Sequence, residues 1–469
     1  MADYEVIIGL EFHIQLLTNS KLFSSARNGY ENRPNTNVDD IDIALPGTLP
    51  VINSKAVEFA IKLGLALNCK FNTTSIFSRK HYFYPDLPKG YQITQHDLPI
   101  CEYGNLNFPT KNGIKAVEIE RIHIEEDSGK SLHMDDINCS YCDYNRAGIP
   151  LLEVVTRPDL RSAEEAMDVY KALRTLVIHL DICDGNMQEG SIRADANVSI
   201  RKHDEKIFGI RTEIKNINSV KFLGQAINHE FHRQILKVES GQRINRETRL
   251  WDSHNKISKP LRDKETILDY RYFPDPDLPP LIISESRIRM VHNLIQELPI
   301  QKQIRYQEEF QLTANEASIL ISNKVITLYF EQTLKLYKNA KNIANWIINE
   351  MQLSPMITIF QLAQLIRLID DKIVTTKIAR YIYEKLLNNQ AVMPIEIVAD
   401  EKLEIQHDCE ILQEIIKKII INNPTEVQKY KSGKTRVFEF LMGQVIKNTR
   451  GVADPNMAKT ILKEYLDQI

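Results

Sequence analysis

Four segments of the chain alternate apolar and polar residues with the period of two that predicts β-strands. In segment 6–16 every second residue is apolar, from Val6 to Leu16. Segments 117–126, 191–201 and 210–216 repeat the pattern. Each strand carries an acidic residue on its polar face: Glu11, Glu125, Asp195 and Glu213. Acidic residues are disfavoured inside ordinary strands, so these four single out one face for closer attention.

The strand at 117–126 changes phase in its middle. Val117 and Ile119 are apolar before Arg121, whereas Ile122 and Ile124 are apolar after it. A slip of one residue moves side chains to the other face and predicts a β-bulge, which often re-aims side chains beside an active site. The three acids that follow, 125–127, repel one another unless they are solvated, paired or bound to a metal. A solvated strand end is the simpler alternative.

The remaining pattern predicts the domain organisation. Amphipathic helices are expected at 53–68, at 162–180 behind a capping box, and at 219–238. Strands 191–201 and 207–216, which a short polar link joins, should form a hairpin. Strands and helices do not alternate regularly, so we expect an α+β fold with a largely antiparallel sheet. From about residue 297 short amphipathic helices follow one another, which predicts a sheet domain at 1–294, an all-α domain at 295–402 and a small helical tail at 403–469.

The four acids predict a metal and phosphate site if their strands share one sheet. Glu11, Glu125, Asp195 and Glu213 would then converge, and the same faces carry His13, Arg193, Arg211 and Lys215. Carboxylates bind Mg²⁺ through hard oxygen atoms, and fixed cations neutralise phosphate. The pattern gives the face of each strand but not which strands are neighbours.

Two loops combine aromatic, charged and proline residues. Segment 79–95 places four aromatic residues among Arg79, Lys80 and Lys89, and segment 269–281 alternates aromatic residues, acids and prolines. Aromatic and basic residues together suit a nucleotide or a base. The alternative is that these loops only pack on the sheet.

Composition and charge narrow the function classes. The 469 residues are 43% apolar and 26% charged, with a net charge of -3, and no apolar run approaches the length of a membrane span. Six scattered cysteines do not form a disulfide framework, so we expect a cytoplasmic protein, and the single CxxC at Cys139 and Cys142 is a weak zinc signal. Between residues 415 and 463, ten basic residues face three acidic ones. This basic tail is typical of a phosphate-backbone contact, although a solvated helix face explains the charge equally well.

Ordered motifs then give a family resemblance. They are IGLEFHIQL, PNTN, LPGTLPVIN, RKHYFYPDLPKGYQITQ, RIHIEEDSGKS, DYNRAGIPLLEVV, GSIRADANVSIR, EIKNINS, ETRLW, DYRYFPDPDLPPL and GQVIKNTRGVADPNM. Together they run the whole length of the chain and resemble the GatB family, one of the subunits of the bacterial Asp/Glu-tRNA amidotransferase.

The resemblance implies an enzyme subunit that forms a carbon–nitrogen bond with glutamine as the amide donor. The enzyme of this family converts Glu on tRNA(Gln), or Asp on tRNA(Asn), into the amide. An amidase subunit releases ammonia, the GatB subunit phosphorylates the side-chain carboxylate with Mg-ATP, and a small third subunit joins the two. The N-terminal cradle of the family resembles glutamine synthetase and guanido kinases, and its helical tail contacts the tRNA.

Carried onto this sequence, the resemblance implies the following site. The Mg²⁺ ligands are expected among Glu11, His13, Glu125, Asp195 and Glu213, with Glu126 as a further catalytic acid. The ATP phosphates are expected at Arg79, Lys80, Tyr82, Lys130, Arg193, Arg211 and Lys215. The tRNA is expected at Lys429, Lys431, Lys434, Arg436, Lys447, Arg450 and Lys459. Two alternatives remain. A non-catalytic tRNA-binding scaffold would not need the four acids, which are all present. A metal-dependent nuclease or hydrolase would leave the cations and the aromatic loop without a purpose.

One departure from the family concerns zinc. Many members carry a CxC and a CxxC that bind zinc, whereas the corresponding positions here are Ser24, Ala26, Asp39 and Asp42. We therefore expect no structural zinc, and polar and backbone contacts must hold this loop.

Overall fold

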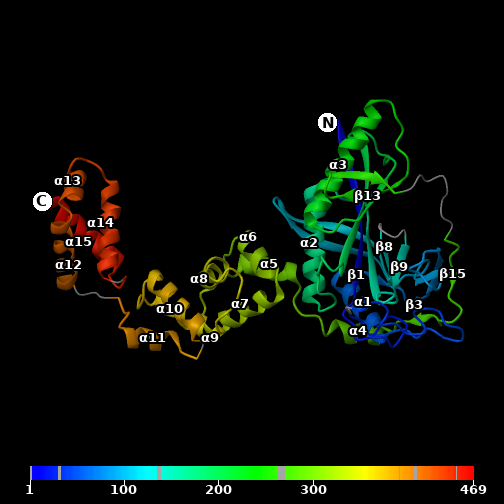
Figure 1. Ribbon diagram of the computed structural model, residues 1–469, viewed down its shortest axis with the longest axis horizontal. Helices are drawn as coiled ribbons and strands as arrows, with labels where there is room; N and C mark the ends of the chain where they lie inside the picture. The colour runs from blue at the N-terminus through cyan, green and yellow to red at the C-terminus, as the bar shows by residue number, and fades with distance from the viewer. Residues whose placement is uncertain are drawn as a thin grey trace. The chain divides into compact units, whose positions relative to one another are not determined.

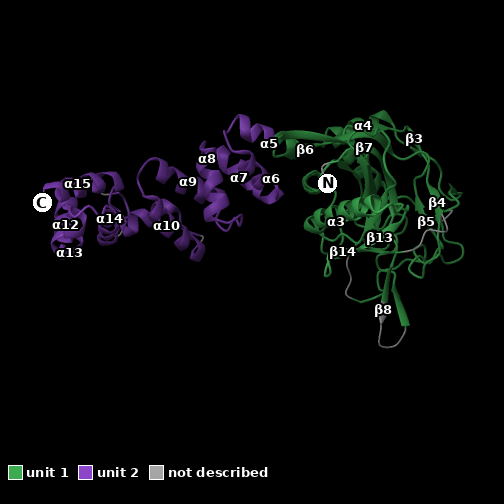
Figure 2. Cartoon of the chain, turned by 90° about the horizontal axis from the view of Figure 1, so that it is seen from above, with its two compact units in different colours: residues 1–302 green, residues 303–469 purple. Residues whose placement is uncertain are grey.

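The chain forms two compact units in the computed structural model. The structure describes residues 3–29, 33–134, 139–261, 270–389, 391–405, 409–449 and 451–468. Unit 1 is Met1–Lys302 and unit 2 is Gln303–Ile469 (Figure 2). Arg450, one of the predicted tRNA contacts, lies outside the described residues, as does the first residue of the predicted loop 269–281.

Unit 1 is built on a large sheet. Within the described residues its nine strands are, in order across the sheet, β14 (Ile257–Pro260), β13 (Thr248–Asp252), β12 (Thr212–Lys215), β11 (Ile192–Lys202), β1 (Tyr4–Gln15), β10 (Pro150–Thr156), β7 (Gly113–Glu126), β6 (Cys101–Thr110) and β2 (Lys70–Phe71). All neighbouring pairs are antiparallel except β12 and β13. The predicted order, a largely antiparallel sheet domain followed by helices, is confirmed.

One face of this sheet is the hydrophobic core. The apolar residues of β1, from Val6 to Ile14, are at most 7% exposed. Helices α1 (Ser54–Ala66), α2 (Ala163–His179) and α3 (Val220–Glu239) contribute to the same core. Helices α2 and α3 pack side by side along the sheet (Figure 1). The opposite face of the central strands is therefore left for polar side chains.

The predicted β-bulge is present. Val155 of β10 pairs with Arg121 of β7, but the next residue, Thr156, pairs with Ile119, so Glu120 is passed over. Strand β6 skips the same residue, and its own unpaired residue, Tyr103, has a φ of 55°. The bulge reverses the facing of β7, so that His123 and Glu125 lie on the polar face.

The predicted strand at 210–216 is shorter than expected. Strand β12 begins at Thr212, and only Ala196–Val198 of β11 pair with it. The antiparallel pairing predicted for this hairpin is correct, but the connection is a longer irregular segment, 203–211. Arg211 lies in that segment and is exposed.

Smaller sheets flank the large one. They pair β15 (Phe273–Pro274), β4 (Ser78–His81) and β5 (Tyr91–Thr94), then β16 (Leu281–Ile282) with β3 (Thr74–Ser75), and β8 (Lys130–Met134) with β9 (Cys139–Asp143). Cys139 and Cys142 are three residues apart along β9, so their side chains leave opposite faces of the strand. The CxxC therefore does not bring two thiols together at one metal.

The rest of the described chain is helical. The helices are α4 (Glu285–His292), α5 (Pro299–Glu308), α6 (Ala314–Ile321), α7 (Lys324–Leu336), α8 (Ala340–Asn345), the π-helix η1 (Trp346–Glu350), α9 (Ile359–Asp370), α10 (Thr376–Asn388), α11 (Pro394–Glu401), α12 (Cys409–Asn422), α13 (Pro424–Lys431), α14 (Arg436–Asn448) and α15 (Pro455–Gln468). In unit 2 the buried apolar side chains form two clusters, one mainly from α5 to α11 and one from α12 to α15. The division into three domains at 294/295 and 402/403 stays a prediction.

The loop at the positions expected to lack zinc is held by a buried ion pair. Lys21 is fully buried, and its Nζ lies 2.8 Å from Asp42 Oδ2 and donates to Asn37 O at 2.8 Å. Ser25 Oγ donates to Asp39 Oδ2 at 2.9 Å. Both acids at the predicted positions therefore have polar partners within the chain.

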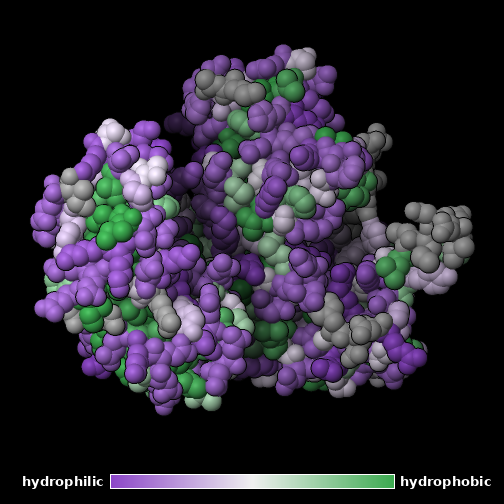
Figure 3. All heavy atoms as spheres, turned by 60° about the vertical axis from the view of Figure 1, so that its left-hand side comes forward, coloured by the Kyte–Doolittle hydropathy of each residue, from purple (hydrophilic) through white to green (hydrophobic). Residues whose placement is uncertain are grey.

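In the view of Figure 3, hydrophobic residues lie in separate groups among hydrophilic ones. Among the described helices, none combines the length and the apolar character that crossing a membrane requires.

Candidate functional site

A row of charged side chains crosses the polar face of the sheet. In register across β11, β1, β10 and β7 it reads Arg193, His13, Glu153 and His123. Residues directly opposite one another on antiparallel strands share a face, so their side chains are neighbours. Glu125 lies two residues beyond His123 on the same face of β7.

Two histidines and two glutamates of this row form a tight cluster. His13 Nε2 lies 3.5 Å from Glu125 Oε1 and 3.6 Å from Glu153 Oε2. His123 Nε2 lies 3.0 Å from Glu153 Oε2 and 3.5 Å from Glu125 Oε2. One ligand atom each of His13, Glu125 and Glu153 fall within 4.8 Å of one another, and such a group can hold a metal ion.

The cluster changes the protonation of its members. Burial works against a charged His123, but Glu153 and Glu125 outweigh it and raise the pKa of His123 to about 9. The pKa of His13 is raised in the same way against its burial, by Glu153 and Glu125. Burial works to raise the pKa of Glu153, but His123 and His13 hold that pKa well below its usual range. Without a metal, the histidines neutralise the buried glutamates.

The other predicted acids form a second group beside the first. Asn197 Nδ2 donates to Glu11 Oε1 at 2.7 Å. Lys215 Nζ lies 2.8 Å from Asp195 Oδ2 and 2.9 Å from Glu213 Oε1. Burial, then Glu153 and Glu213, raise the pKa of Glu11. The predicted convergence thus occurs, but as two groups, one paired with histidines and one with a lysine.

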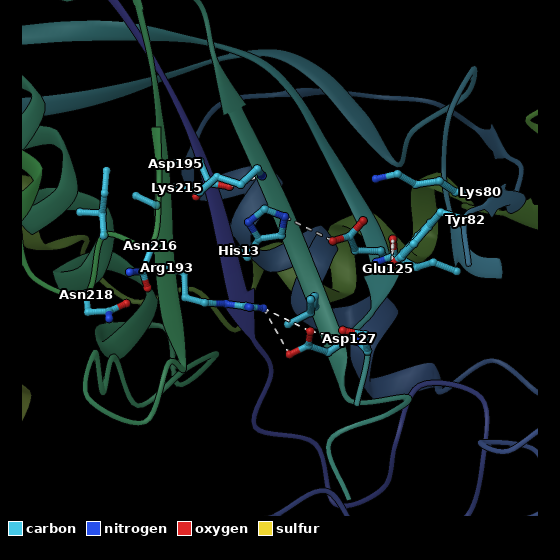
Figure 4. A pocket seen from close by; sticks show the side chains of 15 residues that line it. His13, Lys80, Tyr82, Glu125, Asp127, Arg193, Asp195, Lys215, Asn216 and Asn218 are labelled. Carbon is cyan, nitrogen blue, oxygen red and sulfur yellow. Dashed lines mark hydrogen bonds and ion pairs between the residues drawn. The ribbon is translucent and has the colours of Figure 1, made fainter. Parts of the chain in front are cut away.

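A cavity of about 420 Å³ opens over these residues (Figure 4). Its lining comprises His13, Lys80, Tyr82, Gln92, Glu125, Asp127, Ser128, Leu151, Arg193, Ala194, Asp195, Lys215, Asn216, Ile217 and Asn218. Arg193 reaches across the floor of this view toward Asp127, and His13 points toward Glu125. Acidic and basic groups therefore meet in one hollow.

Asp127 carries two arginines at one end of the cavity. Arg193 Nη2 donates to Oδ2 at 3.2 Å and to Oδ1 at 3.3 Å, and Arg146 Nε lies 3.4 Å from Oδ2. Burial works to raise the pKa of Asp127, but the two guanidinium groups hold that pKa below its ordinary value. Two guanidinium groups therefore share the carboxylate of Asp127, and of these two Arg193 lines the cavity.

Lys80 and Tyr82 enter the cavity from β4 and the loop after it. The Lys80 ammonium lies 5.0 Å from the ring centre of Tyr270. Burial works against its charge, but Glu125 raises the pKa of Lys80. A second cavity of about 180 Å³ shares Lys80 and Glu125 with the first. Its lining also includes Glu11, Thr94, Gln95, His96, Arg121, His123, Glu153 and Tyr272.

The two aromatic loops pack against each other. Strand β15 pairs with β4, the His96 ring stacks on Tyr272 with ring centres 3.9 Å apart, and Tyr82 meets Tyr270 edge to face. Lys80 and Tyr82 line the cavity while neighbouring aromatic residues pack against one another, and nucleotide binding by these loops stays a prediction.

Several residues predicted for the metal and phosphate site line neither cavity. Glu213 Oε1 lies 2.9 Å from Lys215 Nζ, and Glu213 Oε2 accepts a hydrogen bond from Thr248 Oγ1 at 2.7 Å. Glu126 forms an ion pair with Lys89 and accepts from Ile93 N at 2.9 Å. These acids are therefore already occupied by partners from the chain itself.

Three of the predicted phosphate cations, Arg79, Lys130 and Arg211, also line neither cavity. Arg79 lies 2.7 Å from Asp275 and 2.8 Å from Asp277. Lys130 on β8 and Arg211 before β12 are exposed. The predicted tail cations in the described residues are also all exposed, on α13, α14, α15 and the α13–α14 turn.

Three residues of the site were missed by the sequence reasoning. Glu153 lies on β10, whose pattern of Leu151, Leu152, Glu153, Val154 and Val155 is a nearly continuous apolar run. One acid inside a buried strand is the signal that would have found it, because a buried charge needs a partner. His123 and Asp127 lie in the motif RIHIEEDSGKS, but neither was assigned a role in the site.

Comparisons with known proteins agree on one family. The family model described as "GatB/GatE catalytic domain" matches residues 6–289, and "GatB domain" matches 328–466. A protein of Nitratidesulfovibrio vulgaris (strain DP4) is 43% identical over 99% of this chain and 100% of its own length. A protein of Caldicellulosiruptor bescii is 44% identical over the full length of both, and one of Myxococcus xanthus is 41% identical over 99% of each. All three are named as the B subunit of aspartyl/glutamyl-tRNA(Asn/Gln) amidotransferase, and at this identity and coverage the chain belongs to that family.

Proposed function

We propose that this chain binds Mg-ATP in the 420 Å³ cavity and phosphorylates the side-chain carboxylate of Glu on tRNA(Gln), or of Asp on tRNA(Asn). The supporting observation is the polarity of the cavity: His13 and Glu125 with Glu153 on one side, and Arg193 beside Asp127 on the other. A metal–polyphosphate complex has the same polarity, since a hard cation and an anion are joined in one ligand.

The reaction needs activation because a carboxylate does not react with ammonia. Its carbon is shielded by negative charge, and oxide is a poor leaving group. In the first step the carboxylate oxygen bonds to the terminal phosphorus of ATP, and the bond from that phosphorus to ADP breaks. In the second, the nitrogen of ammonia bonds to the acyl carbon, phosphate leaves with the C–O electron pair, and the nitrogen loses a proton to give the amide.

The residues present fit a divalent metal. Glu125 and Glu153 offer carboxylate oxygens, which suit Mg²⁺, and His13 Nε2 lies within reach of both. The bound ion would supply charge screening between the two anions that react. Glu11, Asp195 and Glu213, also proposed as ligands, are held by Asn197 and Lys215 and would join a metal only after those contacts change.

Three cations line the cavity and would meet the phosphate oxygens: Arg193, Lys215 and Lys80. Tyr82 lines the same cavity. Arg79, Lys130 and Arg211 were proposed for this role, but Arg79 is paired with two aspartates and the other two lie away from the lining. Their contribution would require movement of β4, of β8 and of the segment before β12, which carry them.

The relatives are named as one subunit of a larger enzyme, which supports a multi-subunit assembly. We propose a cytoplasmic heterotrimer in which an amidase subunit hydrolyses glutamine to release ammonia and a small third subunit joins the complex, without a membrane. The exposed tail cations, Lys429, Lys431, Lys434, Arg436, Lys447 and Lys459, would contact tRNA phosphates, with Arg450 beside them in sequence.

The test uses the chain reconstituted with its amidase and small partner subunits, Glu-charged tRNA(Gln), Mg-ATP and either glutamine or free ammonia. The amino acid released from the tRNA is identified for the wild type, Glu125→Gln and Glu118→Gln. Glu118 is a matched control on the same strand, with a side chain 67% exposed. We expect glutamine from the wild type and the control, and none from Glu125→Gln even with ammonia. Wild-type yields from Glu125→Gln would refute the site.

The same experiment separates the scaffold alternative. A scaffold would bind charged tRNA but would neither consume ATP nor form the amide with any nitrogen donor. Consumption of ATP that depends on charged tRNA, and that stops in Glu125→Gln, excludes it.

A further inference from the structure

The Arg193 side chain contacts the buried carboxylate of Asp127. Strand β7 ends at Glu126, and Asp127 follows it, fixed by backbone hydrogen bonds from its N to Ile149 O at 2.8 Å and from Gly148 N to its O at 3.0 Å. Its side chain is 6% exposed and takes both hydrogen bonds from Arg193 Nη2. Gln15 Nε2 donates to the same carboxylate at 3.3 Å.

Arg193 has other acids within its reach. Asp195 lies two residues along β11 on the same face, and Glu125 faces the same cavity. A long, flexible arginine can pair with any of these carboxylates, and pairing with Glu125 would occupy a proposed metal ligand. The buried Asp127 keeps the guanidinium at the opposite end of the cavity instead. The Arg193 side chain is still 36% exposed, so it can meet a ligand there.

We propose that Asp127 is a positioning residue that holds the Arg193 guanidinium against the polyphosphate of the nucleotide. This inference rests on the proposed function and deepens it. Asp127 does not itself meet the phosphate, because two anions repel. It acts through the arginine: Nη2 of the guanidinium donates to both carboxylate oxygens, and the rest of the charged group remains for phosphate oxygens.

A purely structural role is the competing explanation. Arg146 donates from Nε to Ser128 O at 3.1 Å and from Nη2 to Gly129 O at 2.9 Å, besides pairing with Asp127. Asp127 would then only hold the turn after β7. The two explanations predict different partners for Asp127 in an energetic coupling experiment.

The experiment is a pair of double-mutant cycles in the reconstituted complex: Asp127→Asn with Arg193→Ala, and Asp127→Asn with Arg146→Ala. For each variant, Mg-ATP binding is measured by calorimetry without tRNA. In the complete reaction, kcat is measured together with the KM values for ATP and for charged tRNA. Asp252→Asn is the matched control, since Asp252 pairs with Lys259 at the far edge of the sheet.

We expect Asp127→Asn and Arg193→Ala each to weaken Mg-ATP binding about 10- to 100-fold, and the double variant to be no weaker than Arg193→Ala. KM for charged tRNA should stay within about twofold. Additive losses with Arg193→Ala, combined with coupling to Arg146→Ala, would overturn the proposal in favour of the structural role. Absence of Mg-ATP binding to the wild type would instead overturn the proposed function, and this inference with it.

A second measurement tests the proposal even if the Asp127→Asn variant does not fold. Arg193→Ala leaves a space in front of an intact Asp127, so millimolar guanidinium chloride should restore at least tenfold of the lost Mg-ATP affinity, whereas sodium chloride at equal concentration should not. If guanidinium and sodium salts act alike, Asp127 does not hold a cation for the nucleotide.

Discussion

Replacement of Glu153 by Gln should remove a pH-dependent part of the stability of unit 1. Glu153 Oε2 lies 3.0 Å from His123 Nε2, and both side chains are largely buried, with exposures of 12% and 7%. Burial alone would lower the pKa of His123, but Glu153 and Glu125 raise that pKa from 6.5 to about 9. A rise of this size in the pKa corresponds to about 3 kcal/mol in the free energy of unfolding.

The direction of the change in stability with pH follows from the linkage between proton binding and folding. A group whose folded pKa exceeds its unfolded pKa stabilises the fold fully below the unfolded value, 6.5, and loses that contribution as the pH rises through about 9. The free energy of unfolding of the wild type should therefore fall by about 3 kcal/mol between about pH 6 and pH 9.5, in the absence of divalent metal. In Glu153→Gln the neutral amide cannot favour the imidazolium, so the fall should be less than about 1 kcal/mol.

The assay follows urea unfolding by tryptophan fluorescence with EDTA present. The chain has two tryptophans, Trp251 in unit 1 and Trp346 in unit 2, so a Trp346→Phe background reports unit 1 alone. Glu165→Gln is the control. Burial works to raise the pKa of Glu165, but its ion pair with Lys115 lowers that pKa, so Glu165 does not titrate between about pH 6 and pH 9.5. Equal pH dependence in the wild type and Glu153→Gln would refute the assignment of His123 as a cation held by Glu153.

Three further predictions concern the Lys21 loop and the tail. Lys21→Met leaves Asp42 buried without its partner and should lower the free energy of unfolding by about 3–5 kcal/mol, and a loss under about 1 kcal/mol would contradict this. Gly148→Ala should destabilise more than Gly47→Ala by about 1 kcal/mol or more, since both have positive φ (83° and 88°) but only at Gly148 does a Cβ meet Asp42 Oδ1 at 2.7 Å; equal urea midpoints would argue against the clash. Lys434→Ala and Arg436→Ala should each reduce the slope of the logarithm of the tRNA-binding constant against the logarithm of the salt concentration by about one. Lys335→Ala on α7 should leave that slope unchanged. Unchanged slopes for the two tail variants in filter binding would show that the tail does not contact the tRNA.

Local sequence patterns predicted the side-chain facing of the strands that carry the site. The facing of each strand follows from alternation, because a period of two fixes which side chains share a face, and the bulge at Glu120 follows from the slip of that period. The acids Glu11, Glu125, Asp195 and Glu213 could therefore each be assigned to the polar face of its own strand before any pairing was known. The order of a sheet domain followed by helices also follows from local patterns, since helix and strand periods differ.

Pairing between distant segments could not be read in this way. Strand β10 lies between β1 and β7, and only this insertion places Glu153 beside His13 and His123. Its apolar run hides the acid, because every residue of β10 is buried, and a strand buried on both faces reads as a continuous apolar run instead of alternating. Likewise, the partner of each cation depends on which carboxylate lies nearest in space. Arg79 was expected at phosphate but lies against Asp275, nearly two hundred residues along the chain.

The sequence by itself therefore determined the family, the fold class and the faces that carry the chemistry, since motifs and periodicity are properties of neighbouring residues. Tertiary structure alone decided how the charges are divided: His13, His123, Glu125 and Glu153 in one cluster, and Lys215 with Asp195 and Glu213 in another. It also decided that Arg193 lies against Asp127. The physical reason is that Coulomb energy depends on distance in space and on burial, and both are set only when strands far apart in the chain come together.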